Sequence, residues 1–370
     1  MIMNTIKTIC FWGGFTNHHF ELAKAIDRIG YKVIVIKSHS EQERSERVPE
    51  DVCESIKLFE IDSYNESIQL IKANNIRETL HINTALKNNN SMLHDILKYL
   101  CKNKYYVFSL PQESFQLKGV KGFFNFLKWF YYLHFTYRRN IIGFGLTGNN
   151  AFSCFRKLLV KEKKCFHFIY ATRTAPSLPF IKNKKIRFIF VGAIDKRKNI
   201  IPFVKYMLGF KNQAYEMSIY GSWSLDNELK EVIKNTPNIK FHGLKSYSEV
   251  RKSMLKADYL VLPSLYDGWG AVANEGLQSG CKLILSEQCG SSIFPSKHSE
   301  LGYVFDAYNL SSLRPIMHDV FENGPLSVTE RVFIKSWADN HISPFVLANY
   351  LDKIIKHFFD KSQKPNCPWL

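Results

Sequence analysis

The chain of 370 residues lacks an apolar run that could cross a membrane. It contains no uninterrupted stretch of about 18 apolar residues, the minimum expected of a membrane-spanning helix. Residues 1–10 also lack the apolar centre of a signal peptide. We therefore expect a cytoplasmic protein, either soluble or held peripherally on the inner face of the plasma membrane.

Sequence patterns typical of metal sites are also missing. The eight cysteines are scattered, no Cys-x-x-Cys pair occurs, and there is no Asp-x-Asp tripeptide. Structural zinc sites, by contrast, usually take ligands at short, repeated spacings. We expect reduced thiols, and neither a metal nor another cofactor.

Acidic residues are scarce relative to basic ones. The 33 Asp and Glu against 50 Lys and Arg leave a formal charge of +17. Such a balance indicates an anionic partner, which could be nucleic acid, a phosphate-rich ligand or an anionic membrane. Because no nucleic-acid-reading motif accompanies the charge, we expect no nucleic-acid partner, and a basic nucleic-acid-binding protein is kept as the alternative.

Strand and helix patterns alternate along two successive parts of the chain. Glycines follow several strands, as in Rossmann-like units, and 45% hydrophobic residues suffice for two cores. This alternation predicts an α/β fold with two doubly wound parallel sheets. The expected strands are 6–12, 32–36, 56–61, 79–83, 105–110, 141–146 and 165–170, then 186–191, 216–220, 239–241, 259–262, 282–286 and 303–305.

The stretch 172–185 is polar and contains Pro176 and Pro179, as expected of an interdomain linker. We predict a Rossmann-like N-terminal domain over 1–180 and a second over 181–342, facing each other across a cleft. Residues 343–370 are expected to form a helix and tail that cross back to the first domain.

The most informative segment is 257–280, a hydrophobic strand followed by a glycine-rich loop and a helix. Gly268 and Gly270 would let the backbone approach a ligand, and the start of the helix would attract anionic oxygens. Asp267 and Glu275 could then reach different parts of one elongated ligand. A plain Asp-Gly turn before a helix, with Glu275 solvated, explains the local pattern equally well.

This segment resembles the signature of glycosyltransferase family 4, retaining enzymes of the GT-B fold, in which two glutamates are separated by seven residues. Asp267 takes the first position and Glu275 the second, with Gly268, Trp269 and Gly270 in the loop. The resemblance implies that Asp267 contacts the transferred sugar and Glu275 the nucleotide ribose. Asp267 is one methylene shorter than the usual glutamate.

Three further segments resemble the same family. In 190–199, Lys198 holds the position of a lysine that neutralises the donor diphosphate. Ala193 stands where an arginine is usual, and Lys196 and Arg197 can compensate. Without its place after a strand and glycine, this basic run would be an ordinary solvated turn. The segments 218–229 and 238–250 place Gly221, Gly243 and Leu244 beside the nucleotide.

The first half carries fewer such residues. Gly13 and Gly14 follow the first strand, where relatives place a loop near donor and acceptor, although an ordinary turn capped by Thr16 is an equal alternative. Residues 108–115 resemble a subgroup of polysaccharide-assembly enzymes. In that setting Glu113 would bind acceptor hydroxyls or act as a catalytic base; an exposed loop glutamate is the other interpretation.

Residues 114–161 contain eight Lys or Arg and no acid. Within them, 118–139 is basic and rich in aromatics, as in helices that lie on anionic membranes. A buried helix whose lysines face solvent is the alternative.

Together these features predict a retaining glycosyltransferase. It would move a sugar from a nucleotide-sugar donor to a glycan acceptor, which we expect to be undecaprenyl-linked, in the biosynthesis of lipopolysaccharide, O-antigen or capsule. The resemblance implies that neither a metal nor a protein nucleophile is needed. A sugar-nucleotide epimerase of the same fold is the alternative enzyme.

Overall fold

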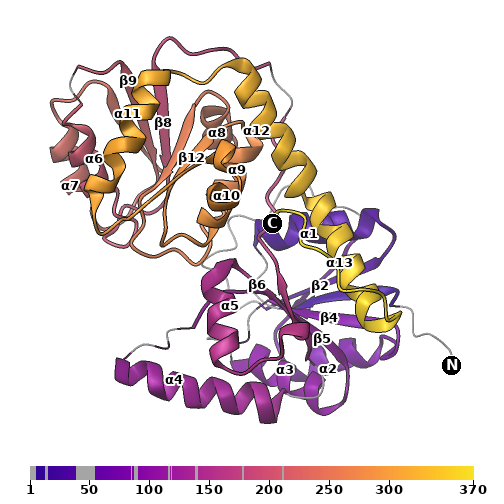
Figure 1. Ribbon diagram of the computed structural model, residues 1–370. Helices are drawn as coiled ribbons and strands as arrows, with labels where there is room; N and C mark the ends of the chain where they lie inside the picture. Colours follow the sequence, from indigo (N-terminus) through magenta and orange to yellow (C-terminus); the bar gives the residue numbers. More distant parts are fainter. Residues whose placement is uncertain are drawn as a thin grey trace. The chain divides into compact units, whose positions relative to one another are not determined.

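The computed structural model describes residues 6–12, 16–38, 55–84, 86, 91–115, 117, 119–137, 141–176, 179–210 and 212–370. The chain divides into two compact units (Figure 1). The first comprises Met1–Arg173 with Pro344–Pro368, and the second Thr174–Ser343 with Trp369–Leu370. Each unit is built on a parallel sheet, which confirms the predicted α/β class with two Rossmann-like units.

The described part of the first unit contains a seven-stranded parallel sheet in the order β3-β2-β1-β4-β5-β6-β7. Every residue of β1 and β4 is buried, because parallel strands are covered on both faces, and the buried residues include the polar Thr8, His81 and Asn83. The strands are β1 (Thr8–Trp12), β2 (Lys32–Ser38), β3 (Lys57–Ile61), β4 (Thr79–Asn83), β5 (Tyr106–Gln112), β6 (Ile141–Leu146) and β7 (Cys165–His167).

The C-terminal helix α13 (Pro344–Phe359) belongs to this first unit and packs beside α1 (Asn17–Arg28) (Figure 1). The Tyr31 hydroxyl donates to Asp352 Oδ1 at 2.8 Å, and the Phe168 and Tyr350 rings stack at 6.0 Å. The unit's other helices are α2 (Tyr64–Lys72), α3 (Ser91–Lys102), α4 (Gly119–Tyr131), the π-helix η2 (Tyr132–Thr136), α5 (Gly148–Lys157) and the 3-10 helix η3 (Glu162–Lys164).

The second unit has a six-stranded parallel sheet among the described residues, in the order β10-β9-β8-β11-β12-β13. Strand order therefore reverses between β8 and β11, as in the nucleotide-binding Rossmann arrangement. The strands are β8 (Ile186–Val191), β9 (Tyr215–Tyr220), β10 (Ile239–Gly243), β11 (Tyr259–Leu262), β12 (Lys282–Ser286) and β13 (Gly302–Phe305).

The helices of the second unit that were not expected from the sequence include α11 (Leu313–Asn323) and α12 (Val328–His341). Ser327 and Glu330 nevertheless form a capping box at the start of α12, a signal that the sequence does contain. The remaining helices are α6 (Ile200–Met207), α7 (Asp226–Ile233), α8 (Tyr247–Met254), α9 (Val272–Gln278) and α10 (Ile293–Lys297).

Helix α4 is not the buried helix that the sequence left open as an alternative. Only Gly122 and Trp129 are buried along it, whereas Phe123 and Phe124 are exposed. Lys121 and Lys128 are also exposed. Lys118, the first residue of the predicted basic stretch 118–139, lies outside the described residues, as do residues 138–140.

Seven of the eight cysteines are described, and all seven are free thiols. Six of them are buried. Burial raises the pKa of Cys101 and Cys281 to about 12, which makes these thiols weak nucleophiles at neutral pH.

His81 is a fully buried ionisable group at the centre of the first sheet. The Trp12 indole donates to His81 Nδ1 at 2.9 Å, and the Tyr105 ring meets the imidazole edge-on at 5.4 Å. Burial lowers the pKa of His81 to about 3, because no water solvates a charged ring there. The folded protein therefore keeps this imidazole neutral.

Acidification should destabilise the first unit through His81. In the unfolded chain His81 takes up a proton near pH 6.5, and in the folded chain only near pH 3. The stability that the neutral, buried imidazole contributes is therefore present above pH 6.5 and decreases as pH falls. We expect the free energy of unfolding to fall by about 2 kcal/mol between pH 6.5 and 5. Urea unfolding at both pH values should show a smaller loss for His81→Gln, which keeps an acceptor for Trp12. Equal losses in the two proteins would contradict the prediction.

Candidate functional site

The loops that follow β8 and β11 flank the point where strand order reverses in the second sheet. In open α/β sheets this position, at the carboxyl ends of the strands, is where ligands bind. The two loops contain most of the residues that the sequence singled out. Arg197 and Lys198 follow β8, and residues 267–270 follow β11.

Lys198 is held by a tight turn after β8. Its backbone N–H donates to Asp195 Oδ1 at 2.7 Å, and the next residue, Asn199, adopts a left-handed conformation with φ 55°. Hydrogen bonds also join the two loops: Leu265 N–H donates to the Arg197 carbonyl at 2.8 Å, and Arg197 Nη1 donates to the Tyr266 carbonyl at 3.1 Å. These hydrogen bonds fix the position of the loop that contains Lys198.

The lysine reaches across the switch point to Asp267. Lys198 Nζ donates to Asp267 Oδ2 in a close ion pair, and the two side chains are only 12% and 13% exposed. Such a pair is screened less by water than a surface pair. The structure thus brings together two residues that the sequence assigned to different parts of one ligand.

The loop after Asp267 depends on close backbone packing. Asp267 N–H donates to the Gln288 carbonyl, and Gly290 N–H donates to the Asp267 carbonyl, both at 3.1 Å. A Cβ on Gly290 would lie 2.2 Å from the Gly268 oxygen. Gly270 has φ +79° and faces the Asp267 carboxylate, so a side chain there would be strained and crowded.

Trp269, which the sequence placed among the donor contacts, has its side chain in the core. The indole is 1% exposed, donates to Asn274 Oδ1 at 3.0 Å and meets the Phe294 ring edge-on at 5.3 Å. Its side chain therefore anchors the loop to α9 and α10, and only its backbone remains for a ligand.

Glu275 lies on α9 and is half-buried. Its carbonyl accepts from Arg251 Nη1 at 2.6 Å, and a Cβ on the neighbouring Gly276 would lie 3.2 Å from Leu260 on β11. The backbone at Glu275 is consequently fixed against the sheet that also carries Asp267.

Glycines end the three strands on the other side of the switch point. Gly221 N–H donates to the Gly243 carbonyl at 2.9 Å, and a Cβ on Gly221 would lie 1.9 Å from the Gly192 oxygen. These contacts keep side chains away from the sheet edge beside Lys198. Leu244 follows Gly243 and is 72% exposed.

Gly221→Ala should destabilise the second unit by about 1–3 kcal/mol, because the new methyl group overlaps Gly192 and the φ of +123° disfavours any side chain. Gly243→Ala is the matched control: its φ is +67°, but a Cβ meets open space. Urea unfolding measures both. A larger loss in the control would contradict the packing argument.

Three residues beside this site were missed by the sequence analysis. Asp195 orients the Lys198 loop, and its spacing of three residues from Lys198 is a turn signal that the sequence does contain. Trp223 is 67% exposed after β9. The buried Ser291 hydroxyl has no hydrogen-bond partner among the described residues and would lie 3.3 Å from a Cβ on Gly270. No sequence pattern marks Ser291.

In the first unit, Glu113 follows β5 and is exposed. The Tyr170 hydroxyl donates to Glu113 Oε1 at 2.9 Å, the His18 ring lies 5.3 Å from the Tyr170 ring, and His18 Nδ1 is 3.0 Å from the Ala171 carbonyl. His18 and Tyr170 were not predicted with Glu113, because only the fold brings these three segments together. Gly13 and Gly14 lie outside the described residues.

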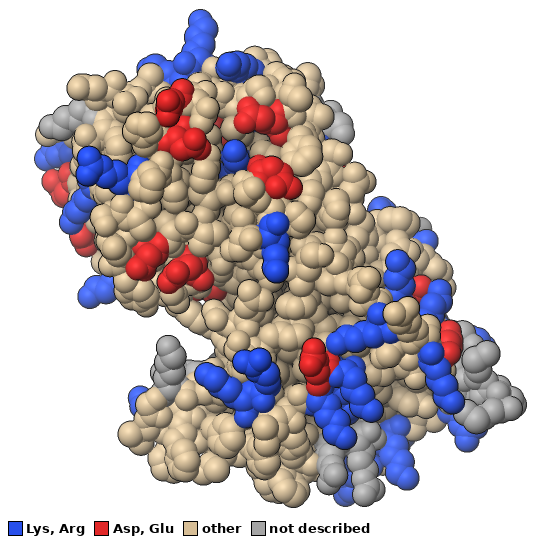
Figure 2. All heavy atoms as spheres, in the orientation of Figure 1, with Lys and Arg blue, Asp and Glu red and all other residues tan. Residues whose placement is uncertain are grey.

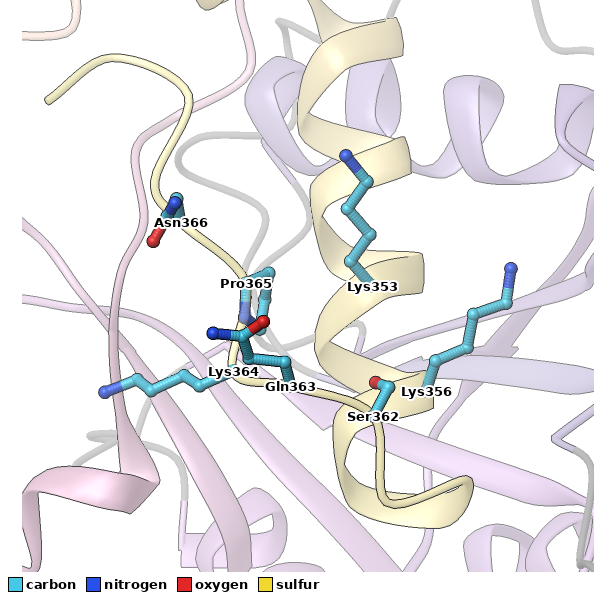
Figure 3. Close-up of a pocket in the computed structure, with 7 residues that line it drawn as sticks. All are labelled: Lys353, Lys356, Ser362, Gln363, Lys364, Pro365 and Asn366. Atoms are coloured by element: carbon cyan, nitrogen blue, oxygen red, sulfur yellow. The ribbon is translucent and has the colours of Figure 1, made fainter.

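A pocket of about 480 Å³ lies elsewhere in the first unit, lined by Lys353, Lys356 and residues 362–366. Figure 3 shows the amino groups of Lys353, Lys356 and Lys364 pointing apart. Lys356 pairs with Asp352 at 2.8 Å, and Lys364 donates to the Glu162 carbonyl at 3.1 Å. The lysines therefore do not converge on one anion, and no predicted site residue lines this pocket.

Within the described ranges, no group of three or more His, Cys, Asp or Glu side chains is arranged to hold a metal ion. The site offers a ligand the cations of Lys198 and Arg197 and the carboxylate of Asp267, with Glu275 on the adjoining helix. This combination suits a ligand that carries both anionic and hydroxyl oxygens.

Residues 174–331 match the family model for glycosyl transferases group 1. The chain is 29% identical over 124 residues to an uncharacterised glycosyltransferase of Methanocaldococcus jannaschii, covering 33% of this chain and 32% of that protein. It is 23% identical over 201 residues to the poly(glycerol-phosphate) alpha-glucosyltransferase of Bacillus subtilis, covering 49% and 30%. The chain thus spans about a third of the length of these curated relatives. The family model and the two relatives support the prediction of an enzyme of the glycosyltransferase class.

Solved structures with the same fold cover nearly the whole chain. A glycosyltransferase of Rickettsia africae superposes with a TM-score of 0.70 at 13% identity, over 97% of this chain and 100% of that one. A lipopolysaccharide outer core galactosyltransferase superposes with a TM-score of 0.68 at 12% identity, over 96% of this chain and 100% of that one. The Anabaena protein HepE in complex with UDP superposes with a TM-score of 0.68 at 10% identity, over 95% of this chain and 100% of that one. At these identities the likeness concerns the fold, two Rossmann-like units as in GT-B glycosyltransferases.

Proposed function

We propose that this chain is a retaining glycosyltransferase of family 4 that transfers a sugar from a nucleotide-sugar donor to a glycan acceptor. The observation that carries the proposal is the Lys198–Asp267 pair at the switch point of the second sheet. It lies inside the segment that matches the group 1 glycosyltransferase family. A solved neighbour of the same fold binds UDP.

In this proposal the Lys198 ammonium group binds the donor diphosphate. Without a donor its charge is met by Asp267, and an arriving diphosphate would compete for the ammonium group and leave the Asp267 carboxylate to accept from sugar hydroxyls. Negative charge grows on the diphosphate as the sugar leaves, so a cation held at this point stabilises the transition state. Arg197 and the backbone of Gly268 and Gly270 complete the phosphate contacts.

The nucleoside end of the donor would lie toward Glu275 and the loops after β9 and β10. The Glu275 carboxylate would accept hydrogen bonds from the ribose hydroxyls, and its negative charge would strengthen these bonds. Gly221 and Gly243 leave the sheet edge open, and Leu244 offers apolar surface to the base.

The transfer step needs no protein nucleophile in this proposal. The bond between the anomeric carbon and the diphosphate oxygen breaks, and the acceptor oxygen bonds to the same face of that carbon. The acceptor proton passes to the leaving phosphate, so atoms and charge balance. Glu113, with Tyr170 and His18 around it, is proposed to orient the acceptor hydroxyl in the first unit. Neither a metal nor another cofactor takes part.

We further propose that the acceptor is undecaprenyl-linked and that the protein works peripherally on the cytoplasmic face of the plasma membrane, in surface-polysaccharide biosynthesis. Support comes from the basic, aromatic stretch 118–139 and from a neighbour named as a lipopolysaccharide galactosyltransferase. No helix in the described ranges is long and apolar enough to cross a bilayer.

A panel of UDP-, GDP-, CMP- and dTDP-sugars tests the proposal, scored by calorimetric binding and by slow donor hydrolysis. One nucleotide class should bind and release sugar with retained anomeric configuration. An epimerised nucleotide sugar as the product would point instead to the epimerase alternative. Binding of none of the four classes would overturn the proposal.

A further inference from the structure

Helix α4 presents two apolar faces, of which only one packs against the protein. On the inner face, Trp129 is 4% exposed and stacks on Phe115 with ring centroids 4.1 Å apart. The outer face consists of large apolar side chains that are between 48% and 78% exposed, namely Val120, Phe123, Phe124, Leu127, Tyr131 and, on η2, Phe135.

These exposed side chains form one continuous stripe. Their spacings of three and four residues place them on one side of the helix. The Tyr131 and Phe135 rings stack at 5.6 Å, and the Phe123 and Phe124 rings meet edge-on at 5.9 Å. Contiguous apolar surface of this kind on a soluble protein marks an interaction site. We refer to these six residues as the aromatic stripe.

The charges carried by α4 and by the segments that follow it are of one sign. Lys121 and Lys128 are exposed on the neighbouring side of the helix, and no acid occurs anywhere from residue 114 to 161. His134 Nε2 lies 2.7 Å from the Leu158 carbonyl, which ties η2 to the end of α5, where Arg156 and Lys157 are exposed. At the lower left of Figure 2, where Figure 1 places α4, the surface is mostly tan and shows no acidic residue.

An apolar stripe on a helix whose own charges are all cationic matches the boundary of an anionic bilayer, where acyl chains meet negatively charged headgroups. Together α4 and η2 are about 27 Å long, at about 1.5 Å per residue. Because one side of this segment packs on the protein, it suits lying in the interface plane. A protein partner for the same surface would need acids placed to meet the lysines, whereas an anionic bilayer supplies negative charge along the whole face.

We infer that the aromatic stripe inserts into the interface of an anionic bilayer, while Lys121 and Lys128 contact the headgroup phosphates. The inference rests on the proposed membrane-bound acceptor and specifies its contact: apolar insertion holds the protein, and charge selects the lipid. It differs from a purely electrostatic contact in a measurable way, because insertion survives salt whereas exposed charge pairs are screened.

The test is flotation of the full chain with vesicles of phosphatidylcholine containing phosphatidylglycerol, at low and high salt. The wild type should float under both conditions. The triple variant Phe123→Ser, Phe124→Ser and Leu127→Ser should partition at least about tenfold more weakly in both. The double variant Lys121→Gln and Lys128→Gln should lose its preference for phosphatidylglycerol but still float, because the aromatic stripe is left in place.

A matched control removes three exposed apolar side chains from the second unit, Ile181, Val332 and Phe333, each replaced by serine. This control should float like the wild type. If the stripe variant floats as well as the wild type, or if wild-type flotation disappears at high salt, the inference is overturned. A wild-type dimer without lipid that becomes monomeric in the stripe variant would also overturn it, in favour of a second copy on this face.

The same variants separate this inference from the proposed activity. The stripe variant should bind donor as the wild type does, because α4 is not part of the Lys198 and Asp267 site. If no nucleotide sugar binds to any of these proteins while the stripe still controls flotation, the proposed activity fails and the membrane contact stands.

Discussion

Lys198→Ala is expected to lower the rate of sugar transfer by about 100- to 1,000-fold, the usual cost of removing one group that stabilises developing charge. The variant should also bind a nucleoside diphosphate more weakly, yet bind the nucleoside alone as the wild type does, because the lysine is assigned to the phosphates. Calorimetry with both ligands, together with a donor hydrolysis assay, measures these effects. Equal losses for nucleoside and diphosphate would remove Lys198 from the phosphate site.

The Lys198 test needs controls, because the variant leaves the Asp267 carboxylate 13% exposed and without its cation. The double variant Lys198→Ala with Asp267→Asn removes both charges, and it should regain the stability lost in the single variant but not the diphosphate affinity. Lys205→Ala, which removes an exposed lysine on α6 of the same unit, should change little. A larger loss in Arg197→Ala than in Lys198→Ala would transfer the phosphate role to the arginine.

Glu275→Ala is expected to weaken the donor and the free nucleotide together by about 1.5–3 kcal/mol, the range for a hydrogen bond to a charged group. Both ligands contain the ribose, so both should lose the same amount, unlike the result for Lys198. The Glu275 backbone is held by Arg251 through the carbonyl oxygen, which the substitution leaves in place, so the fold should persist.

The matched control for Glu275 is Glu231→Ala, an exposed helical glutamate that pairs with Lys234 on the surface of the same unit. It should bind nucleotide as the wild type does. Unchanged nucleotide affinity in a folded Glu275→Ala protein would end the ribose assignment.

Much of the fold could be predicted because hydrophobic periodicity acts locally. The expected strand at 186–191 coincides with β8, and the one at 165–170 differs from β7 only at its end. Parallel strands are buried on both faces, so each is a short apolar run that ends at a turn. Helices α11 and α12 escaped prediction because polar residues interrupt their apolar pattern, although Ser327 and Glu330 mark the start of α12.

The sequence by itself determined the two-unit α/β fold and the residue types of the candidate site, because strand patterns and glycine-rich turns are local in the chain. Tertiary structure decided which of these residues meet: Lys198 pairs with Asp267, Tyr170 bonds to Glu113, and Trp269 turns into the core. Such contacts join residues far apart in the chain and depend on strand order, which no local pattern encodes. The aromatic stripe of α4 has the same origin, since an apolar helix face is buried or exposed only according to what packs against it.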